Sequence, residues 1–329
     1  MIASAGGRCQ TSPPFAFLDA GLWVILEPLE DGEEMTPLAV EALEKRFGSV
    51  RALAGVSFAV EAGEVFGYLG PNGAGKTTTL RVILGLVRAS AGRVTVFGEA
   101  PGDRRARLKV GYLPGELDLY GEMTGRAILD YFAGFRPDAP PILRAGLVEA
   151  LGLEASDLGR RVKFLSHGTR QKIGLVIAMQ HDPALLLLDE PTTGLDPLVQ
   201  KALREIVLGF AARGRAVFFS SHVLSEVEAV CGRVAILRAG RLVAVEAVED
   251  LRNRMLRRLE VRFRNGVPPD LPAVPGVTRA ESEGSAATLW IRGDVNPVLR
   301  RIAREEVDRF VFPEAELEDI FLAYYRSDR

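Results

Sequence analysis

The sequence predicts an α/β protein whose main domain is built on a largely parallel sheet. Three observations support this. Short apolar stretches alternate with helical patterns from residue 37 to about 240. A glycine-rich run joins one such stretch to an amphipathic helix. The segment Ala184 to Leu188 is apolar throughout, which is typical of a central strand that is covered on both faces.

The glycine-rich run matches G-x-x-x-x-G-K-[ST] at every fixed position. An expected strand at 65–69 precedes it and an expected helix at 77–87 follows it, which is the context that a phosphate-binding loop needs. Glycines let successive N–H groups point inward, and the helix N-terminus adds partial positive charge. We therefore predict that Lys76 reaches the β- and γ-phosphates of ATP and that the Thr77 hydroxyl binds Mg²⁺. The alternative is a chance glycine-rich turn. The predicted nucleotide-binding residues here are Gly70, Pro71, Asn72, Gly73, Ala74, Gly75, Lys76, Thr77 and Thr78.

The other elements of the main domain follow from the same patterns. Residues 123–181 are helical in pattern without strands, which predicts a helical insertion in the α/β core. The expected strands are 38–45, 56–60, 65–69, 93–97, 110–113, 184–188, 216–220 and 234–237.

Changes in composition divide the chain into three parts. Residues 1–34 are rich in Gly, Ser, Pro and acids, and we predict a disordered extension: either the native start is Met35, or the extension is a mobile tail. Residues 35–247 form the predicted main domain, with its helical subdomain at about 116–181. Residues 248–329 are predicted to form a small α+β domain with a basic helix (248–258), strands (259–263, 287–292 and 308–312) and two later helices (296–306 and 316–325).

Composition excludes several classes of protein. The 329 residues carry a formal net charge of −2, which gives no global electrostatic case for binding nucleic acid. Two cysteines and three histidines cannot build a disulfide framework or a zinc site. No apolar stretch reaches the length of a transmembrane helix. We expect a cytoplasmic protein whose role at a membrane, if any, depends on a partner.

A second half of the predicted site lies at the end of the apolar run at 184–188. Asp189 directly follows this run, as in a Walker B pattern, and is expected to hold Mg²⁺. Glu190 comes next, at the carboxyl lip of the strand, where a carboxylate can take a proton from an attacking water. The alternative reading is an acidic strand end that caps the next helix.

A third group of residues flanks this acidic pair. Ser166 is the second residue of the run Leu165-Ser166-His167-Gly168-Thr169-Arg170-Gln171 and is a good N-cap for the apolar helix that follows. Asp196 lies in Gly194-Leu195-Asp196-Pro197, after the Walker B strand, and His222 follows the expected strand at 216–220.

These five motifs, in this order, resemble the nucleotide-binding subunit of an ABC transporter. The resemblance covers about 37–247 and implies a P-loop NTPase core with an antiparallel β subdomain. It implies that two copies enclose two ATP molecules head to tail, with Ser166 and Gly168 of one copy contacting the ATP bound by the other. Asp196 would couple the two sites, and His222 would contact the γ-phosphate and orient water with Glu190. Phe47 matches the aromatic residue that stacks on adenine, although it could instead be a core residue at a strand end.

The chain departs from the family pattern at two places. A glutamine usually follows the strand at 110–113, but this chain has Gly115 and then Glu116 there, so the way in which this loop senses nucleotide is open. The signature has His167 and Thr169 where glycine and glutamine are usual. Gly168 remains where backbone must approach phosphate, and His167 is read as an interface residue rather than a catalyst.

The C-terminal run from Glu314 to Tyr325 resembles the tail of ATPase subunits from exporters of drugs, antibiotics or polysaccharides. The predicted function is therefore the ATP-hydrolysing motor of an exporter, located at the inner face of the cell membrane. Its predicted partners are a second copy and a separately encoded permease, which docks at about 115–135, and no nucleic acid. Two alternatives remain: a soluble ABC ATPase that acts on nucleic acid or ribosomes, and a slowly hydrolysing module that responds to nucleotide.

Overall fold

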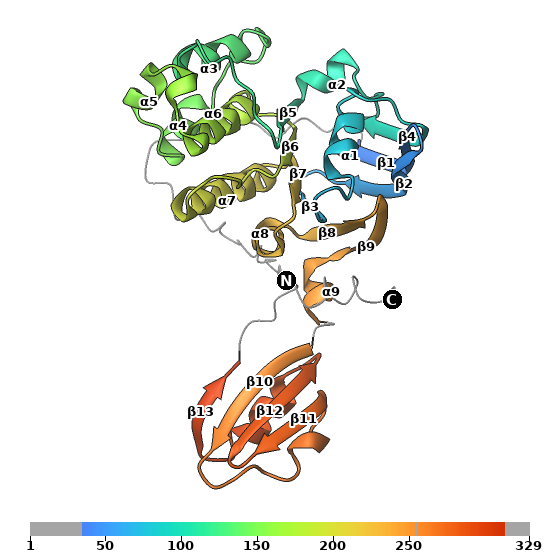
Figure 1. The fold of residues 1–329 in the computed structure, drawn as a ribbon, viewed down its shortest axis with the longest axis vertical. Helices are drawn as coiled ribbons and strands as arrows, with labels where there is room; N and C mark the ends of the chain where they lie inside the picture. The colour runs from blue at the N-terminus through green and yellow to red at the C-terminus, as the bar shows by residue number, and fades with distance from the viewer. Residues whose placement is uncertain (1–34, 254–255, 313–329) are drawn as a thin grey trace, which may run out of the picture. The chain divides into compact units, whose positions relative to one another are not determined.

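The computed structural model describes residues 35–253 and 256–312. Its centre is a six-stranded sheet of order β5-β6-β7-β3-β8-β9, shown in Figure 1. The strands pair in parallel except β8 and β9, which are antiparallel. Their bounds are β3 Val65–Leu69, β5 Val110–Leu113, β6 Leu185–Asp189, β7 Ala216–Ser221, β8 Arg233–Arg238 and β9 Arg241–Ala247.

Alternate residues of the central strands enter two different cores. In β6, Leu186 and Leu188 join the core that lies against the helical insertion, while Leu185 and Leu187 join the core on the other face. Both faces of this strand are therefore buried, and all five of its residues are inaccessible to solvent. The predicted central strand is thus explained by two separate apolar layers, one on each side.

A three-stranded antiparallel sheet of order β2-β1-β4 belongs to the second core. Its strands are β1 Leu38–Phe47, β2 Val50–Val60 and β4 Ala91–Val96, and α1 (Lys76–Ile83) and the short α2 (Arg104–Leu108) lie on the same side. The ring of Phe218 in β7 lies 5.7 Å from that of Phe58 in β2, centroid to centroid, so these rings join the two sheets.

The helical insertion contributes most of the first core. Each of its two longest helices begins at a hydroxyl cap: Thr124 accepts a hydrogen bond from Ala127 N, and Ser166 accepts one from Thr169 N. The helices of the insertion are α3 Gly125–Ala133, α4 Arg144–Ala150, α5 Ala155–Gly159 and α6 His167–Met179. Later in the chain, α7 Pro197–Ala212 and α8 Leu224–Val230 pack into the same core. Among the residues that the structure describes, no helix is both long and apolar enough to cross a membrane.

Residues 256–312 form a second, antiparallel sheet of order β11-β12-β10-β13 with its own apolar core. Buried Leu259, Val261 and Phe263 alternate with polar residues along β10, and α10 supplies Val298 and Ile302. The elements are β10 Leu256–Phe263, β11 Val277–Glu283, β12 Ala286–Arg292, α10 Asn296–Ile302 and β13 Val307–Val311.

Several expected boundaries were wrong. The expected helix at 248–258 ends early, as α9 Val248–Asn253, because the alternation that follows belongs to β10. β2 begins six residues before the predicted start, and β9 and the polar edge strand β11 were not predicted. The expected helix at 316–325 and the extension at 1–34 lie outside the described residues.

We expect Phe218→Ala to lower the free energy of unfolding by about 3–5 kcal/mol, because the ring is fully buried against Phe58, Phe66 and Tyr68 and would leave a cavity. Urea denaturation followed by circular dichroism measures the change. Phe164→Ala is the control: its ring is 61% exposed, and its loss should cost under about 1 kcal/mol. Equal losses for the two variants would contradict this assignment of the core.

Candidate functional site

The phosphate-binding loop joins the end of β3 to the start of α1. Its glycines are required by close backbone contacts. A Cβ added at Gly70 would lie 2.5 Å from Leu237 O, and one at Gly75, where φ is +113°, would lie 2.8 Å from Ala52 O. Lys76 begins α1, and its buried ammonium donates hydrogen bonds to Gly70 O at 2.6 Å and Pro71 O at 3.3 Å. The ammonium group of Lys76 is therefore held inside the loop by two carbonyl groups of the loop backbone.

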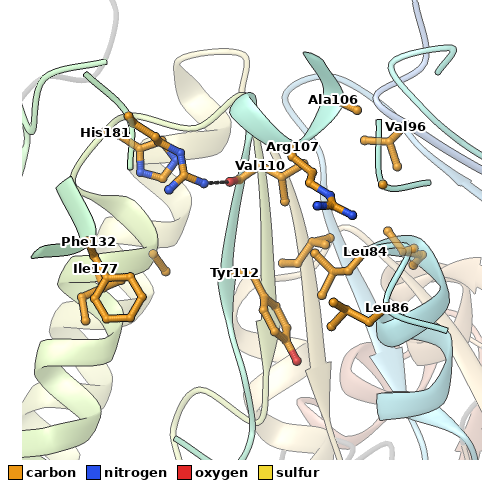
Figure 2. Close-up of a pocket in the computed structure, with 15 residues that line it drawn as sticks. Leu84, Leu86, Val96, Ala106, Arg107, Val110, Tyr112, Phe132, Ile177 and His181 are labelled. Carbon is orange, nitrogen blue, oxygen red and sulfur yellow. Dashed lines mark hydrogen bonds between the residues drawn. The ribbon is translucent and has the colours of Figure 1, made fainter. Parts of the chain in front are cut away.

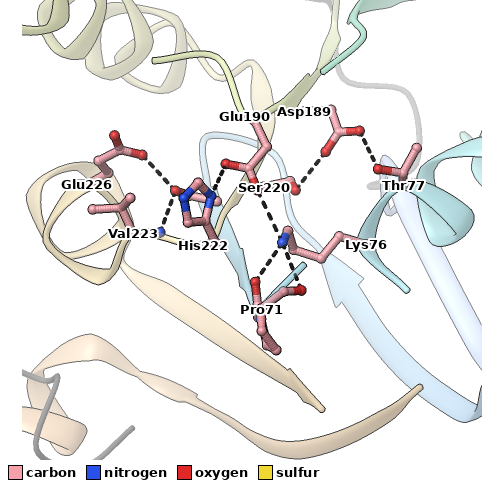
Figure 3. A network of polar contacts seen from close by, with 11 residues as sticks. Pro71, Lys76, Thr77, Asp189, Glu190, Ser220, His222, Val223 and Glu226 are labelled. Atoms are coloured by element: carbon pink, nitrogen blue, oxygen red, sulfur yellow. Dashed lines mark hydrogen bonds and ion pairs between the residues drawn. The ribbon is translucent and has the colours of Figure 1, made fainter. Parts of the chain in front are cut away.

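Asp189 lies at the buried end of β6, facing this loop. Its two carboxylate oxygens accept hydrogen bonds from Thr77 Oγ1 and Ser220 Oγ, each at 2.9 Å (Figure 3). Burial raises the pKa of Asp189 above its ordinary value, and the two hydroxyl donors partly offset this rise. The hydroxyl of Thr77 and the carboxylate of Asp189 are hard oxygen ligands of the kind that Mg²⁺ prefers.

Glu190 lies between the two other predicted catalytic residues. Its Oε1 is 3.1 Å from Lys76 Nζ, and its Oε2 is 2.6 Å from His222 Nδ1. Figure 3 shows the three side chains converging from α1, the end of β6 and the end of β7. The backbone of Glu190 has φ of +51°, a conformation that is costly for a residue with a side chain and is often found at functional sites.

Hydrogen bonds between neighbouring elements hold this arrangement in place. Glu190 N donates to Ser220 O at 3.0 Å, which fixes the end of β6 against β7. Beyond β7, Ser221 Oγ donates to Glu226 at 2.6 Å and accepts from Val223 N at 2.9 Å, so the turn that carries His222 is fixed at both sides. The sequence reasoning missed Ser220, Ser221 and Glu226. Ser220 and Ser221 could have been recognised because two serines stand at the end of an otherwise apolar strand, directly before His222.

The predicted signature residues form a second group, tied to the loop that follows β6. Ser166 caps α6, and a Cβ added at Gly168 would lie 2.7 Å from Gly194 O. The ring of His167 lies over Gly194, where a Cβ would be 2.2 Å from the ring. Asp196 caps α7 by accepting hydrogen bonds from Leu198 N and Val199 N. In the part of the chain that the structure describes, no hydrogen bond connects Ser166, Gly168 or Asp196 to the group formed by Lys76, Asp189, Glu190 and His222.

The remaining predicted residues lie apart from these networks. Phe47 is the last residue of β1, 50% exposed, with Lys45 Nζ 4.7 Å from the centre of its ring; it is not a core residue. Asn72 is exposed and Thr78 half-buried. Gly115 lies beside Asp189, with room for a Cβ at 3.4 Å from Asp189 Oδ2, whereas Glu116 is exposed.

A separate apolar pocket of about 320 Å³ lies between the end of α1 and the helical insertion (Figure 2). Leu84, Leu86 and Tyr112 line one side, and Phe132 and Ile177 line the other. Two buried nitrogen atoms at its edge, Arg136 Nε and His181 Nε2, have no hydrogen-bond partner within the described ranges. Burial and the neighbouring Arg136 lower the pKa of His181 to about 4.

Comparisons with known proteins identify the class. A profile of the family described as ABC transporter matches residues 53–193. The chain is 34% identical to a Nod factor export ATP-binding protein I of Burkholderia lata over 88% of this chain and 96% of that protein. It is 42% identical to an uncharacterized ABC transporter ATP-binding protein of Nostoc sp. over 61% of this chain, a match that spans less than two thirds (62%) of the relative's length.

Solved structures show the same fold. The ATP-binding subunit of an ABC transporter superposes with a TM-score of 0.62 at 32% identity, over 66% of this chain and 92% of that one. A dimeric bacterial ABC transporter cassette superposes with a TM-score of 0.57 at 19% identity, over 64% of this chain and 98% of that one, which shows the fold alone.

The fold and the site thus define an ABC-type ATP-binding cassette. The chain belongs to the ABC transporter ATP-binding proteins. The predictions of the family and of a P-loop NTPase fold with antiparallel strands and a helical insertion are confirmed, and so is the prediction of an ABC-type ATPase domain. The individual roles assigned to the site residues stay predictions.

The pKa of His181 predicts a pH dependence of stability. Because this pKa falls from about 6.5 in the unfolded chain to about 4 in the folded one, the unfolded state binds more protons between these values. Stability is therefore lost as pH falls, by roughly 2 kcal/mol from this residue between pH 7 and pH 5. We expect His181→Gln to flatten the profile of unfolding free energy against pH.

Chemical denaturation at pH 7, 6 and 5 checks this expectation. His167→Gln, a change at an exposed histidine, is the matched control. If His181→Gln and wild type lose the same stability on acidification, His181 is not the group responsible.

Proposed function

We propose that this protein is the ATP-hydrolysing motor of a membrane exporter, and that two copies bind two Mg·ATP and drive a separately encoded permease. Relatives that align over almost their whole length are Nod factor export ATP-binding proteins, which supports export rather than import. The work of the subunit would take place at the cytoplasmic face of the membrane, through the permease.

The observation that carries this proposal is the convergence of Lys76, Glu190 and His222 beside the phosphate-binding loop. Glu190 lies within contact distance of both a buried ammonium and an imidazole. A carboxylate in this place can accept the proton of a water molecule that attacks the γ-phosphate. His222, bonded to Glu190 through Nδ1, would direct its other ring nitrogen toward the phosphate and hold Glu190 in place.

The other residues position the triphosphate. Loop amides and the α1 N-terminus bind phosphate oxygens, and Lys76 would exchange its contacts with Gly70 O and Pro71 O for contacts with the β- and γ-phosphates. Thr77 and Asp189 would hold Mg²⁺, which neutralises charge on the phosphates when it is bound. Phe47, exposed at the end of β1, would stack on the adenine.

The second group of residues suits an interface with another copy. Ser166 and His167 are exposed at the N-terminus of α6, where backbone N–H groups and the helix dipole favour an anion. Gly168 and Asp196 lie on the same side, on segments that contact one another at Gly194. We therefore assign this group to the ATP that the second copy holds.

The permease would dock on the helical insertion. Tyr120, Tyr131 and Phe135 form a cluster of edge-to-face rings that are 41–60% exposed. Leu86, on the far side of the apolar pocket, is 65% exposed. Exposed apolar groups gathered in this way are typical of an interaction surface. The cluster falls within the predicted docking region at 115–135.

The first prediction of this proposal concerns Glu190. Glu190→Gln keeps the shape of the side chain but removes the base, so ATP should still bind while turnover falls by at least about 100-fold. The dimer should accumulate with ATP, as measured by size-exclusion chromatography. Glu205→Gln, a change at an exposed carboxylate on α7 that takes no part in this network, should retain most activity. Wild-type turnover in Glu190→Gln would remove Glu190 from its role.

The second prediction concerns Lys76. Lys76→Ala removes the buried ammonium, so ATP affinity should fall by at least about 10-fold, since hydrogen bonds from charged donors are worth about 1.5–3 kcal/mol. Equilibrium binding of a fluorescent ATP analogue measures this, with the exposed Lys201→Ala as the control. Unchanged affinity in Lys76→Ala would contradict the assignment of the phosphate-binding loop.

One observation favours the alternative of a slowly hydrolysing, nucleotide-responsive module. Gly115 leaves no side chain beside Asp189 where the family usually has glutamine. Because the space accepts a Cβ, Gly115→Gln should fold normally. If that variant hydrolyses ATP much faster than a nearly inactive wild type, the slow module is favoured over the motor.

A further inference from the structure

The short helix α2 presents a dense cluster of cations to solvent. Of its five residues only Ala106 is buried, and Figure 1 shows the helix at the outer edge of the main domain. With the residue that follows the helix, four cations lie within six residues, although the whole chain has a net charge of −2. The exposed residues, which form the α2 patch, are Arg104, Arg105, Arg107, Leu108 and Lys109.

Helical geometry directs the α2 patch away from the protein. At about 3.6 residues per turn, Arg104 and Leu108 lie about 200° around the helix from Ala106, on the side opposite the buried residue. Arg105 and Arg107 lie about 100° from Ala106, one on each flank. Leu108 is 42% exposed. The outer side of α2 is therefore a leucine among arginines, on a turn that projects from the domain.

The α2 patch has no counterion in the part of the chain that the structure describes. None of its four cations forms an ion pair there, whereas Arg144 in the helical insertion pairs with Asp130. The adjacent acid, Asp103, caps the helix, and its carboxylate accepts a hydrogen bond from Arg105 N at 2.7 Å. The positive charge of the patch is therefore available to attract an anionic surface.

We propose that the α2 patch binds the anionic lipid headgroups of a membrane surface directly. The cations attract lipid phosphates, and Leu108 enters the boundary between headgroups and acyl chains. A bilayer fits this shape better than a polypeptide does, because a projecting turn can meet a flat layer of headgroups, whereas peptide segments are bound in grooves or along sheet edges. The contact is separate from the proposed docking on a permease, and it needs no permease.

Sedimentation of the purified full chain with lipid vesicles tests this proposal. The vesicles contain phosphatidylcholine, either alone or mixed with phosphatidylglycerol, and no other protein. We expect the wild-type chain to bind only the vesicles that contain the anionic lipid. Raising salt from about 0.1 M to about 0.5 M should weaken this binding by at least about 10-fold, because salt screens the charges. If the chain does not bind the anionic vesicles at the lower salt concentration, the proposal is wrong.

Charge variants locate the contact. Arg104→Gln combined with Arg105→Gln should weaken binding by at least about 10-fold, since each cation near an anionic surface contributes roughly a factor of five. Lys201→Gln combined with Arg204→Gln is the matched control. These exposed cations lie on α7, which packs into the core on the other face of the central sheet from α2. The control should change binding by less than about 3-fold, and equal losses in the two double variants would contradict the assignment to α2.

Leu108→Ser tests the apolar part of the contact. It should weaken binding by at least about 3-fold, because a leucine that enters the bilayer boundary contributes buried apolar area. Leu208→Ser is the control, at a leucine of α7 that is 43% exposed, and should leave binding unchanged. ATP binding equal to that of wild type shows that each variant is folded.

The outcomes identify the partner. If the charge variants weaken binding but Leu108→Ser does not, the patch contacts anions without entering a bilayer. That result contradicts the proposal and favours an acidic polypeptide or a nucleic acid. Because the vesicles contain no permease, a failure here leaves the exporter proposal unchanged.

Discussion

The site depends on holding two carboxylates and one ammonium at the end of a fully buried strand. Asp189 ends β6 beside Thr77, and Glu190 begins the loop after it, 3.1 Å from the ammonium of Lys76. Such groups are costly to desolvate, and each is compensated in a different way. Two hydroxyl groups bond to Asp189, whereas Glu190 is placed between Lys76 and His222.

These contacts require that three parallel strands end at one edge of the sheet. β3 supplies the loop, β6 the acids, and β7 Ser220 with His222 directly after it. That geometry follows from the alternation of side chains between two apolar cores, which leaves no freedom for a strand to slip by one residue. The arrangement of the predicted catalytic residues thus follows from the packing of the two apolar cores.

Much of this could be predicted from the sequence, because its signals are local. The phosphate-binding loop, the apolar strand before Asp189 and the cap at Ser166 are each set by residues within a few positions. What could not be predicted depends on contacts between distant segments. The hydrogen bond from Ser220 to Asp189, the ring of His167 over Gly194 and the contact of Gly115 with Asp189 each join residues far apart in sequence. The edge strand β11 was missed because its residues are polar and mostly exposed.

The pocket and the carboxylate at the end of β6 are joined by one short strand. Arg136 donates to the carbonyl of Val110 at the first residue of β5, and the loop after β5 brings Gly115 against Asp189. Between these points β5 is hydrogen-bonded to β6 in register, with Leu113 opposite Leu188. The edge of the pocket is therefore connected, through the hydrogen bonds of β5, to the strand that ends at Asp189. Because Gly115 has no side chain, the proposed coupling of docking to hydrolysis would act through the backbone of that loop rather than through a glutamine.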